Sequence, residues 1–95
     1  MRIPENQAAC EALNMTLPLN QAVSRWLVEL LKERGMTQYQ LHQKSGVPKS
    51  TIANLINCTY PSMKLRVIHK LCQGLNLELG DFFSSPLFSE ANLEP

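Results

Sequence analysis

Apolar residues recur at helical spacing along most of this chain, and glycine and proline cut the pattern into short segments. Over residues 21–34 the apolar positions follow the i, i+3, i+4, i+7, i+8 rule of one helical face. They are Val23, Trp26, Leu27, Leu30 and Leu31. No segment shows the sustained alternation of β-branched residues that predicts a strand. We therefore expect an all-α fold, a compact bundle of about five helices.

Capping residues define the first helix and the start of the second. Asn20 suits the N-cap of the helix over 21–34, and Gly35 suits its left-handed C-terminal stop. Thr37 then opens a second helix, because Gln40 three residues later completes the spacing of a capping box.

Gly46 ends the second helix after barely two turns. Pro48 suits the first position of a third helix over 48–57, where a missing amide is harmless. Further helices are predicted over 63–75 and 79–85. The inward-facing residues of the last four helices are predicted to be Leu41, Ile52, Leu55, Ile56, Leu65, Ile68, Leu71, Cys72, Leu75, Phe82 and Phe83. We assign these two phenylalanines and Trp26 to the core rather than to a ligand platform.

A chain of 95 residues fits one small domain. We expect an N-terminal extension over 1–19, the helical domain over 20–85 and a C-terminal tail over 86–95. Within the extension, residues 5–13 have the pattern of one short helix.

The chain lacks the signals of several protein classes. No apolar run approaches the roughly 18 residues of a membrane span, and the first residues lack the apolar block of a secretory signal. The cysteines, Cys10, Cys58 and Cys72, are odd in number and form no CxxC pair, which suits a reducing compartment. We therefore expect a cytoplasmic protein without a membrane partner.

Metal and catalytic chemistry are not expected either. His69 and Cys72 have i, i+3 spacing, but no adequate set of further ligands accompanies them, so we predict no zinc site. A nucleophilic Cys–His pair would need an orienting group and a cleft. We infer no catalytic residue, no cofactor and no small-molecule ligand.

Two short helices separated by a glycine-containing turn form a helix-turn-helix. The run TQYQLHQKSGVPKSTIANLIN, residues 37–57, resembles the Cro/C1-type (XRE-like) family. The flanks resemble it too, with a helix that ends in Gly35, the pattern LxxIxxLCxxL from Leu65 and the run DFF at 81–83. The likeness covers roughly residues 20–83 and implies a lambda-repressor-like DNA-binding domain.

In this arrangement the second helix of the pair enters the major groove. On a helical wheel of residues 48–57 the outer face holds Lys49, Ser50, Ala53 and Asn54. Lysine donates to guanine, asparagine pairs with adenine through two hydrogen bonds, and serine bonds to several bases. The resemblance places base contacts on the same positions, Lys49, Ser50 and Asn54.

Gln38 matches the position where the family has a glutamine that contacts a phosphate, and exposed helix-start amides suit an anion. The other candidates for phosphate contacts are Thr37, Thr59, Tyr60 and Lys64, with Lys44 and Arg66 as weaker ones. For each candidate the alternative is an ordinary solvated or helix-stabilising residue.

Three residues depart from the family pattern. His42 replaces an alanine at a close helix crossing, so it must turn outward or accept a different crossing. Ser45 replaces a frequent leucine. Cys58 replaces a glycine that often ends the recognition helix, so we expect Asn57 to take the left-handed conformation.

The resemblance implies a sequence-specific transcriptional regulator, a repressor acting by occupancy on double-stranded DNA. We expect a homodimer on an inverted repeat with half-sites about 34 Å apart. The dimer patch is expected on Leu87, Phe88 and Leu93 with the last helix, or on residues 1–19. The alternative is a protein-interaction module on the same scaffold, such as an antitoxin-like or anti-regulator partner.

The net charge of +1 hides a segregation of charge. Residues 34–77 hold six cations and no acidic residue, while the remainder holds three cations and all eight acidic residues. The basic segment covers the second to fourth helices, where the DNA-facing surface is expected.

Overall fold

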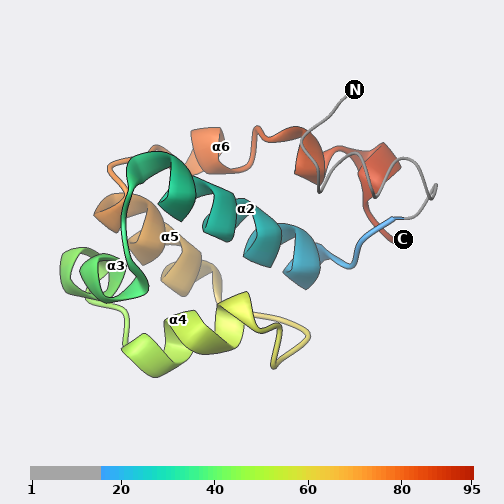
Figure 1. The fold of residues 1–95 in the computed structure, drawn as a ribbon. Coiled ribbons are helices and arrows are strands. Elements are labelled where there is room, and N and C mark those ends of the chain that lie inside the picture. Colours follow the sequence, from blue (N-terminus) through green and yellow to red (C-terminus); the bar gives the residue numbers. More distant parts are fainter. Residues whose placement is uncertain (1–15) are drawn as a thin grey trace.

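The computed structural model describes residues 16–95, and every regular element in that range is a helix (Figure 1). The α-helices are α2 (Leu19–Arg34), α3 (Gln38–Ser45), α4 (Lys49–Ile56), α5 (Leu65–Gly74) and α6 (Leu79–Phe82), followed by the 3-10 turns η1 (Pro86–Phe88) and η2 (Glu90–Asn92). The predicted all-α fold is confirmed. The short helix predicted over 5–13 lies outside the described residues.

Proline, not asparagine, occupies the N-cap of α2. The carbonyl of Pro18 accepts hydrogen bonds from the amides of Gln21 and Ala22, at 3.0 and 3.1 Å. The predicted N-cap role of Asn20 is therefore wrong, because the helix begins before this residue. Its side-chain amide instead donates to the carbonyl of Tyr60, 3.1 Å away, and ties the start of α2 to the loop after α4.

The predicted start and end of α3 are confirmed. The hydroxyl of Thr37 accepts from the backbone amide of Gln40 at 3.0 Å, and the Gln40 side chain accepts from the Thr37 amide at 2.9 Å. Gly46 ends the helix with a φ of 77°. The next helix begins at Lys49, so Pro48 is its N-cap rather than its first residue.

Helices α2, α4 and α5 all end in a Schellman motif, in which a left-handed residue lets two late amides bond back into the helix. In α2 the left-handed residue is Gly35, as predicted, with a φ of 61°. In α4 it is Cys58, with a φ of 54°. In α5 it is Asn76, with a φ of 55°.

The prediction for Asn57 is wrong, since its φ is −86°. The amide of Thr59 bonds to the carbonyl of Asn54 at 3.0 Å, and the amide of Cys58 bonds to that of Leu55 at 3.2 Å. This pattern requires the left-handed turn at Cys58 itself, although a side chain there costs about 1 kcal/mol or more relative to glycine.

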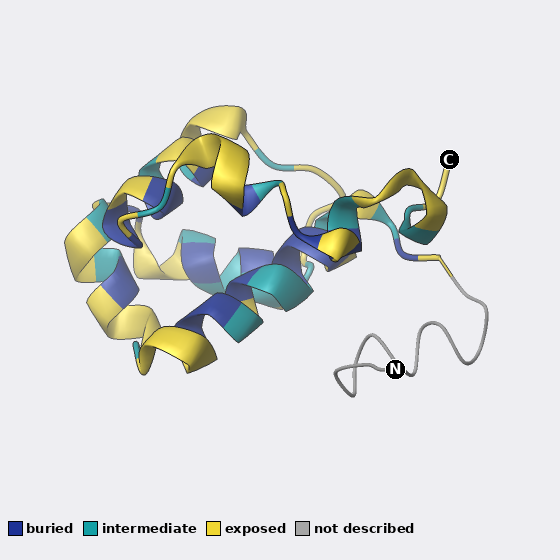
Figure 2. Cartoon of the chain, turned by 90° about the horizontal axis from the view of Figure 1, so that it is seen from above, coloured by how far each residue is buried: buried dark blue, intermediate teal, exposed yellow. Residues whose placement is uncertain are grey.

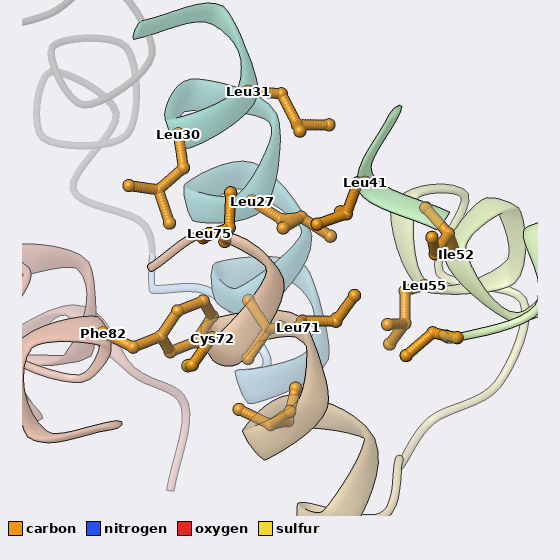
Figure 3. Packing of buried hydrophobic residues seen from close by; sticks show 13 residues of the cluster. Leu27, Leu30, Leu31, Leu41, Ile52, Leu55, Leu71, Cys72, Leu75 and Phe82 are labelled. Carbon is orange, nitrogen blue, oxygen red and sulfur yellow. The ribbon is translucent and has the colours of Figure 1, made fainter. Parts of the chain in front are cut away.

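Side chains from α2, α3, α4 and α5 meet in one core. Figure 3 shows Leu27, Leu41 and Leu71 pointing toward a common centre, with Ile52 and Leu55 of α4 at its side. Figure 2 shows the buried residues on the inward faces of the helices. As predicted, Leu41, Ile52, Leu55, Ile68, Leu71, Cys72, Leu75 and Phe82 are buried, while Trp26, Ile56 and Phe83 are partly buried against this core.

Leu65 is the exception among the predicted core residues, with 74% of its surface exposed. The helix begins at this residue rather than at 63, and burial starts one turn later at Ile68. The apolar period therefore extends one turn beyond the buried part of α5.

The last α-helix is shorter than predicted and ends at Phe82 rather than 85. The hydroxyl of Ser84 donates to the carbonyl of Asp81 at 2.8 Å, and the hydroxyl of Ser85 caps η1 by accepting from the Leu87 amide. Such side-chain bonds compete with continuation of a helix.

The C-terminal segment packs on α2 and on Leu17, just before that helix. The Leu17 amide donates to the carbonyl of Asn92 at 3.0 Å, and the amide of Glu94 donates back to Leu17 at 2.9 Å. A second small cluster consists of Leu17, Ala22 and Leu87, with Trp26, Phe88 and Leu93 packed against it. Of the apolar residues expected in a dimer patch, Leu87 is thus buried within the chain itself, while Phe88 and Leu93 are half-buried.

Helices α3 and α5 are in close contact where Gly74 meets Ser45. A Cβ atom added to Gly74 would lie 2.8 Å from the Ser45 Cβ and 2.9 Å from its backbone nitrogen. Gly74 is therefore required to lack a side chain, and α3 sits closer to α5 than a larger residue at position 74 would allow.

Replacing Gly74 with alanine is expected to lower the free energy of unfolding by about 1–3 kcal/mol, because backbone atoms must shift. The matched control is Gly80→Ala in α6, where no atom lies within 4 Å of the added Cβ. Urea denaturation of both variants measures the difference. Equal stability of the two variants would contradict the close contact.

Replacing Cys58 with glycine is expected to raise the free energy of unfolding by about 0.5–1 kcal/mol, since glycine adopts a positive φ without strain. Asn76→Gly has the same geometry but should gain less, because asparagine tolerates this conformation better. Thermal denaturation measures both gains. A loss of stability in Cys58→Gly would mean that the thiol contributes more than the strain costs.

Candidate nucleic-acid interface

Helices α3 and α4, joined by residues 46–48, form the predicted helix-turn-helix pair, which lies along one side of the bundle (Figure 1). Helix α3 packs against α5, and α4 packs against α2 and α3. Leu41 and Ile52 are fully buried between them, and Val47 in the turn is 1% exposed. The apolar core thus sets the relative orientation of the two helices.

Two hydrogen bonds from side chains hold this pair in place. The buried hydroxyl of Ser24 donates to the carbonyl of Ile56, the last residue of α4, at 2.6 Å. The imidazole Nδ1 of His42 lies 2.8 Å from the carbonyl of Val47 in the turn, and it carries the proton of this bond because a carbonyl only accepts. His42 therefore turns toward the loop and supplies it with a hydrogen bond.

The candidate base-contacting residues occupy two places on α4. Lys49 and Ser50 are exposed on the first turn, and no side chain caps the amides at this helix start. Ala53 and Asn54 are half-buried further along the helix. The predicted outer face is therefore fully open only at its N-terminal end.

Asn54 lines a hollow of about 270 Å³ between α4, the following loop and α5. Tyr60 and Lys64, both candidates for phosphate contacts, line the same hollow, and so does Thr51. Its apolar lining consists of Leu55, Met63 and Val67. The fold thus brings together Asn54, Tyr60 and Lys64, which the sequence places on a helix and a loop.

The remaining phosphate candidates are all exposed. Thr37 and Gln38 lie at the start of α3, Lys44 in its last turn and Thr59 in the loop after α4. The Thr37 hydroxyl accepts a hydrogen bond in the capping box, so its own proton stays available to an acceptor such as a phosphate oxygen.

Two residues that sequence reasoning missed also belong to this surface. Thr51 is half-buried and lines the hollow one turn before Asn54. Tyr39, on α3, is 53% exposed and lies directly beside Lys49. Helical spacing with Asn54 was a signal for Thr51, whereas only the packing of α3 on α4 reveals Tyr39.

Positive charge collects on the helix-turn-helix side of the bundle. Lys49, Lys64 and Arg66 are exposed on α4 and at the start of α5. The acidic residues after Leu77 lie on or next to α6, η1 and η2, which occupy the opposite edge in Figure 1. The acidic residues after Leu77 are thus separated in space from the cations of α4 and the start of α5.

Neither a metal site nor a membrane span is found among residues 16–95. No three His, Cys, Asp or Glu side chains come together there as a metal site. His69 is exposed while Cys72 is buried, and burial raises the pKa of the Cys72 thiol, which disfavours the thiolate that binds metals. No helix in this range is long and apolar enough to cross a bilayer.

Comparison with known proteins identifies the family. Searches of curated proteins and of solved structures gave no match. The Cro/C1-type HTH DNA-binding domain matches residues 27–86, which is more than half of the chain and includes α3, the turn and α4. The chain therefore belongs to the Cro/C1-type helix-turn-helix DNA-binding family.

Proposed function

We propose that this DNA-binding regulator is a sequence-specific repressor that reads the major groove with α4. The observation that carries the proposal is the exposure of Lys49 and Ser50 on the first turn of α4, while Ile52 is fully buried behind them. A helix-turn-helix presents the N-terminal residues of its second helix to base edges. Repression then requires only occupancy of the site, with residues 20–85 as the DNA-binding domain.

Each candidate takes a role that its chemistry supports. Lys49 donates hydrogen bonds to guanine O6 or N7, Asn54 pairs with adenine, and Ser50 can form a hydrogen bond with any of several bases. Phosphate contacts come from Thr37, Gln38, Lys44, Thr59, Tyr60 and Lys64. These groups lie on both sides of α4, on α3 and around the hollow. Such a distribution suits a helix that lies in the major groove between the two sugar-phosphate backbones of the DNA.

One helix of eight residues offers few base contacts, so we propose binding as a homodimer. Two copies on an inverted repeat would present two α4 helices to half-sites about 34 Å apart. Selection of bound sequences from a random duplex library tests this directly, because a dimer selects a palindrome. Selection of single, unpaired half-sites would contradict it.

Exposed leucines favour one other function, a protein-interaction module. Leu19 and Leu65 are 57% and 74% exposed, and both line an apolar hollow of about 150 Å³ with Met63 and Phe83. A contiguous apolar surface of this kind is typical of protein contacts. In that case DNA binding would be weak and independent of sequence.

Replacing Lys49 or Asn54 with alanine should lower affinity for the selected duplex about 5- to 150-fold, as expected for loss of a base contact. The preference for the base pair that each residue reads should disappear as well. Lys32→Ala on α2 is the matched control, since Lys32 is exposed and lies outside the helix-turn-helix. Electrophoretic mobility shifts measure all three variants; unchanged binding of the first two would rule out the assigned base contacts.

Replacing Lys64 with alanine should weaken binding to all duplexes equally, because phosphates carry no sequence information. The plot of log K against log salt concentration should become shallower by about 0.9 per protomer, the value for one lost phosphate contact. Fluorescence anisotropy over a salt series measures the slope. A wild-type slope near zero would instead support the protein-interaction function.

A further inference from the structure

The ammonium group of Lys49 lies over the ring of Tyr39. The Nζ atom is 5.3 Å from the ring centroid, which is within the roughly 6 Å over which a cation is attracted to an aromatic face. The two residues come from different helices of the pair, Tyr39 from α3 and Lys49 from the first position of α4. No sequence spacing within one helix produces this contact.

Tyr39 is itself held in place although it is half-exposed. The side-chain amide of Gln43, one turn later on α3, donates to the Tyr39 hydroxyl at 3.2 Å. The ring also packs against His42, with centroids 5.9 Å apart, and His42 bonds to the carbonyl of Val47 in the turn. The ring that faces Lys49 is therefore restrained by contacts with two residues of α3, and one of them, His42, is itself bonded to the turn.

A lysine side chain has a flexible four-carbon stem and a compact charge that binds any nearby anion. Without a partner, its ammonium reaches phosphates and base edges alike. A ring face removes part of this freedom, yet it uses no hydrogen-bond acceptor, so the N–H donors on the side of the ammonium away from the ring stay available to a base. Ordering a donor before binding lowers the entropic cost of binding.

We propose that Tyr39 is a positioning residue that determines specificity by holding Lys49 in place for its base contact. This inference rests on the proposed function, since it requires that Lys49 reads a base. The opposite consequence of the same contact is also testable: a ring that withholds Lys49 from DNA would weaken binding, and its removal would strengthen it.

The first experiment compares Tyr39→Leu with Tyr39→Phe. Both are measured on a duplex selected by the wild-type protein and on one altered at the base pair that Lys49 reads. The leucine variant should lower the ratio of the two affinities about two- to fivefold, the worth of an exposed cation–ring contact. The phenylalanine variant keeps the ring and should keep most of the ratio.

Tyr60→Leu is the matched control, because Tyr60 is 61% exposed and lies on the other side of α4 in the loop. It should weaken binding to both duplexes equally and leave the ratio unchanged. Addition of Tyr39→Leu to Lys49→Ala should have no further effect on the ratio, since the positioned group is then absent. Circular dichroism verifies that each variant is folded.

The outcomes separate the inference from the function on which it rests. If Lys49→Ala abolishes the base preference but Tyr39→Leu leaves it unchanged or tightens binding, the positioning role is overturned while the function stands. If Lys49→Ala has no effect on the preference, the proposed base contact fails, and the positioning role fails with it.

Nuclear magnetic resonance of the free protein tests the contact without DNA. Protons on the Lys49 Cε beside the ammonium should be shifted upfield by the aromatic ring and return to ordinary values in Tyr39→Leu. The phenylalanine variant should retain the shift. An unshifted Lys49 in the wild-type protein would overturn the inference.

Discussion

The close contact between Gly74 and Ser45 fixes the position of α3, and the arrangement of the candidate interface depends on that position. A Cβ at Gly74 would come within 2.8 Å of Ser45, so any larger residue would push α3 away from α5. Thr37, Gln38 and Tyr39 all move with α3 as one rigid helix. Since interiors are close-packed, a shift of this helix changes its distance from Lys49 and from any bound phosphate.

Helix α4 is too short to hold its own orientation, and its ends are fixed by neighbours. The Ser24 hydroxyl bonds to the carbonyl of Ile56 at one end, and the His42 imidazole bonds to the turn before the other. Asn20 bonds to the loop carbonyl of Tyr60, beside the hollow that Asn54 lines. These contacts make α4 part of a rigid frame, which base recognition needs because hydrogen bonds to base edges tolerate little displacement.

Sequence patterns predicted most of the fold where one local physical cause was sufficient. The capping box of Thr37, the glycine stops at Gly35 and Gly46 and the buried stripe of α5 from Ile68 are local features, and all are confirmed. The errors arose where two local signals competed, or where the packing of neighbouring elements determined whether a residue is buried. Pro18 displaced Asn20 as the N-cap, and Leu65 continued an apolar period beyond the buried part of α5.

The sequence by itself determined the helical fold, the helix-turn-helix and the separation of basic from acidic segments, because helical periodicity, capping and charge are written in residues close together along the chain. Only the tertiary structure decided that Tyr39 lies under Lys49, that Asn54 shares a hollow with Lys64, and that Leu87 packs beside Leu17. Each of these pairs joins different elements, and their distances depend on how whole helices pack rather than on any local spacing.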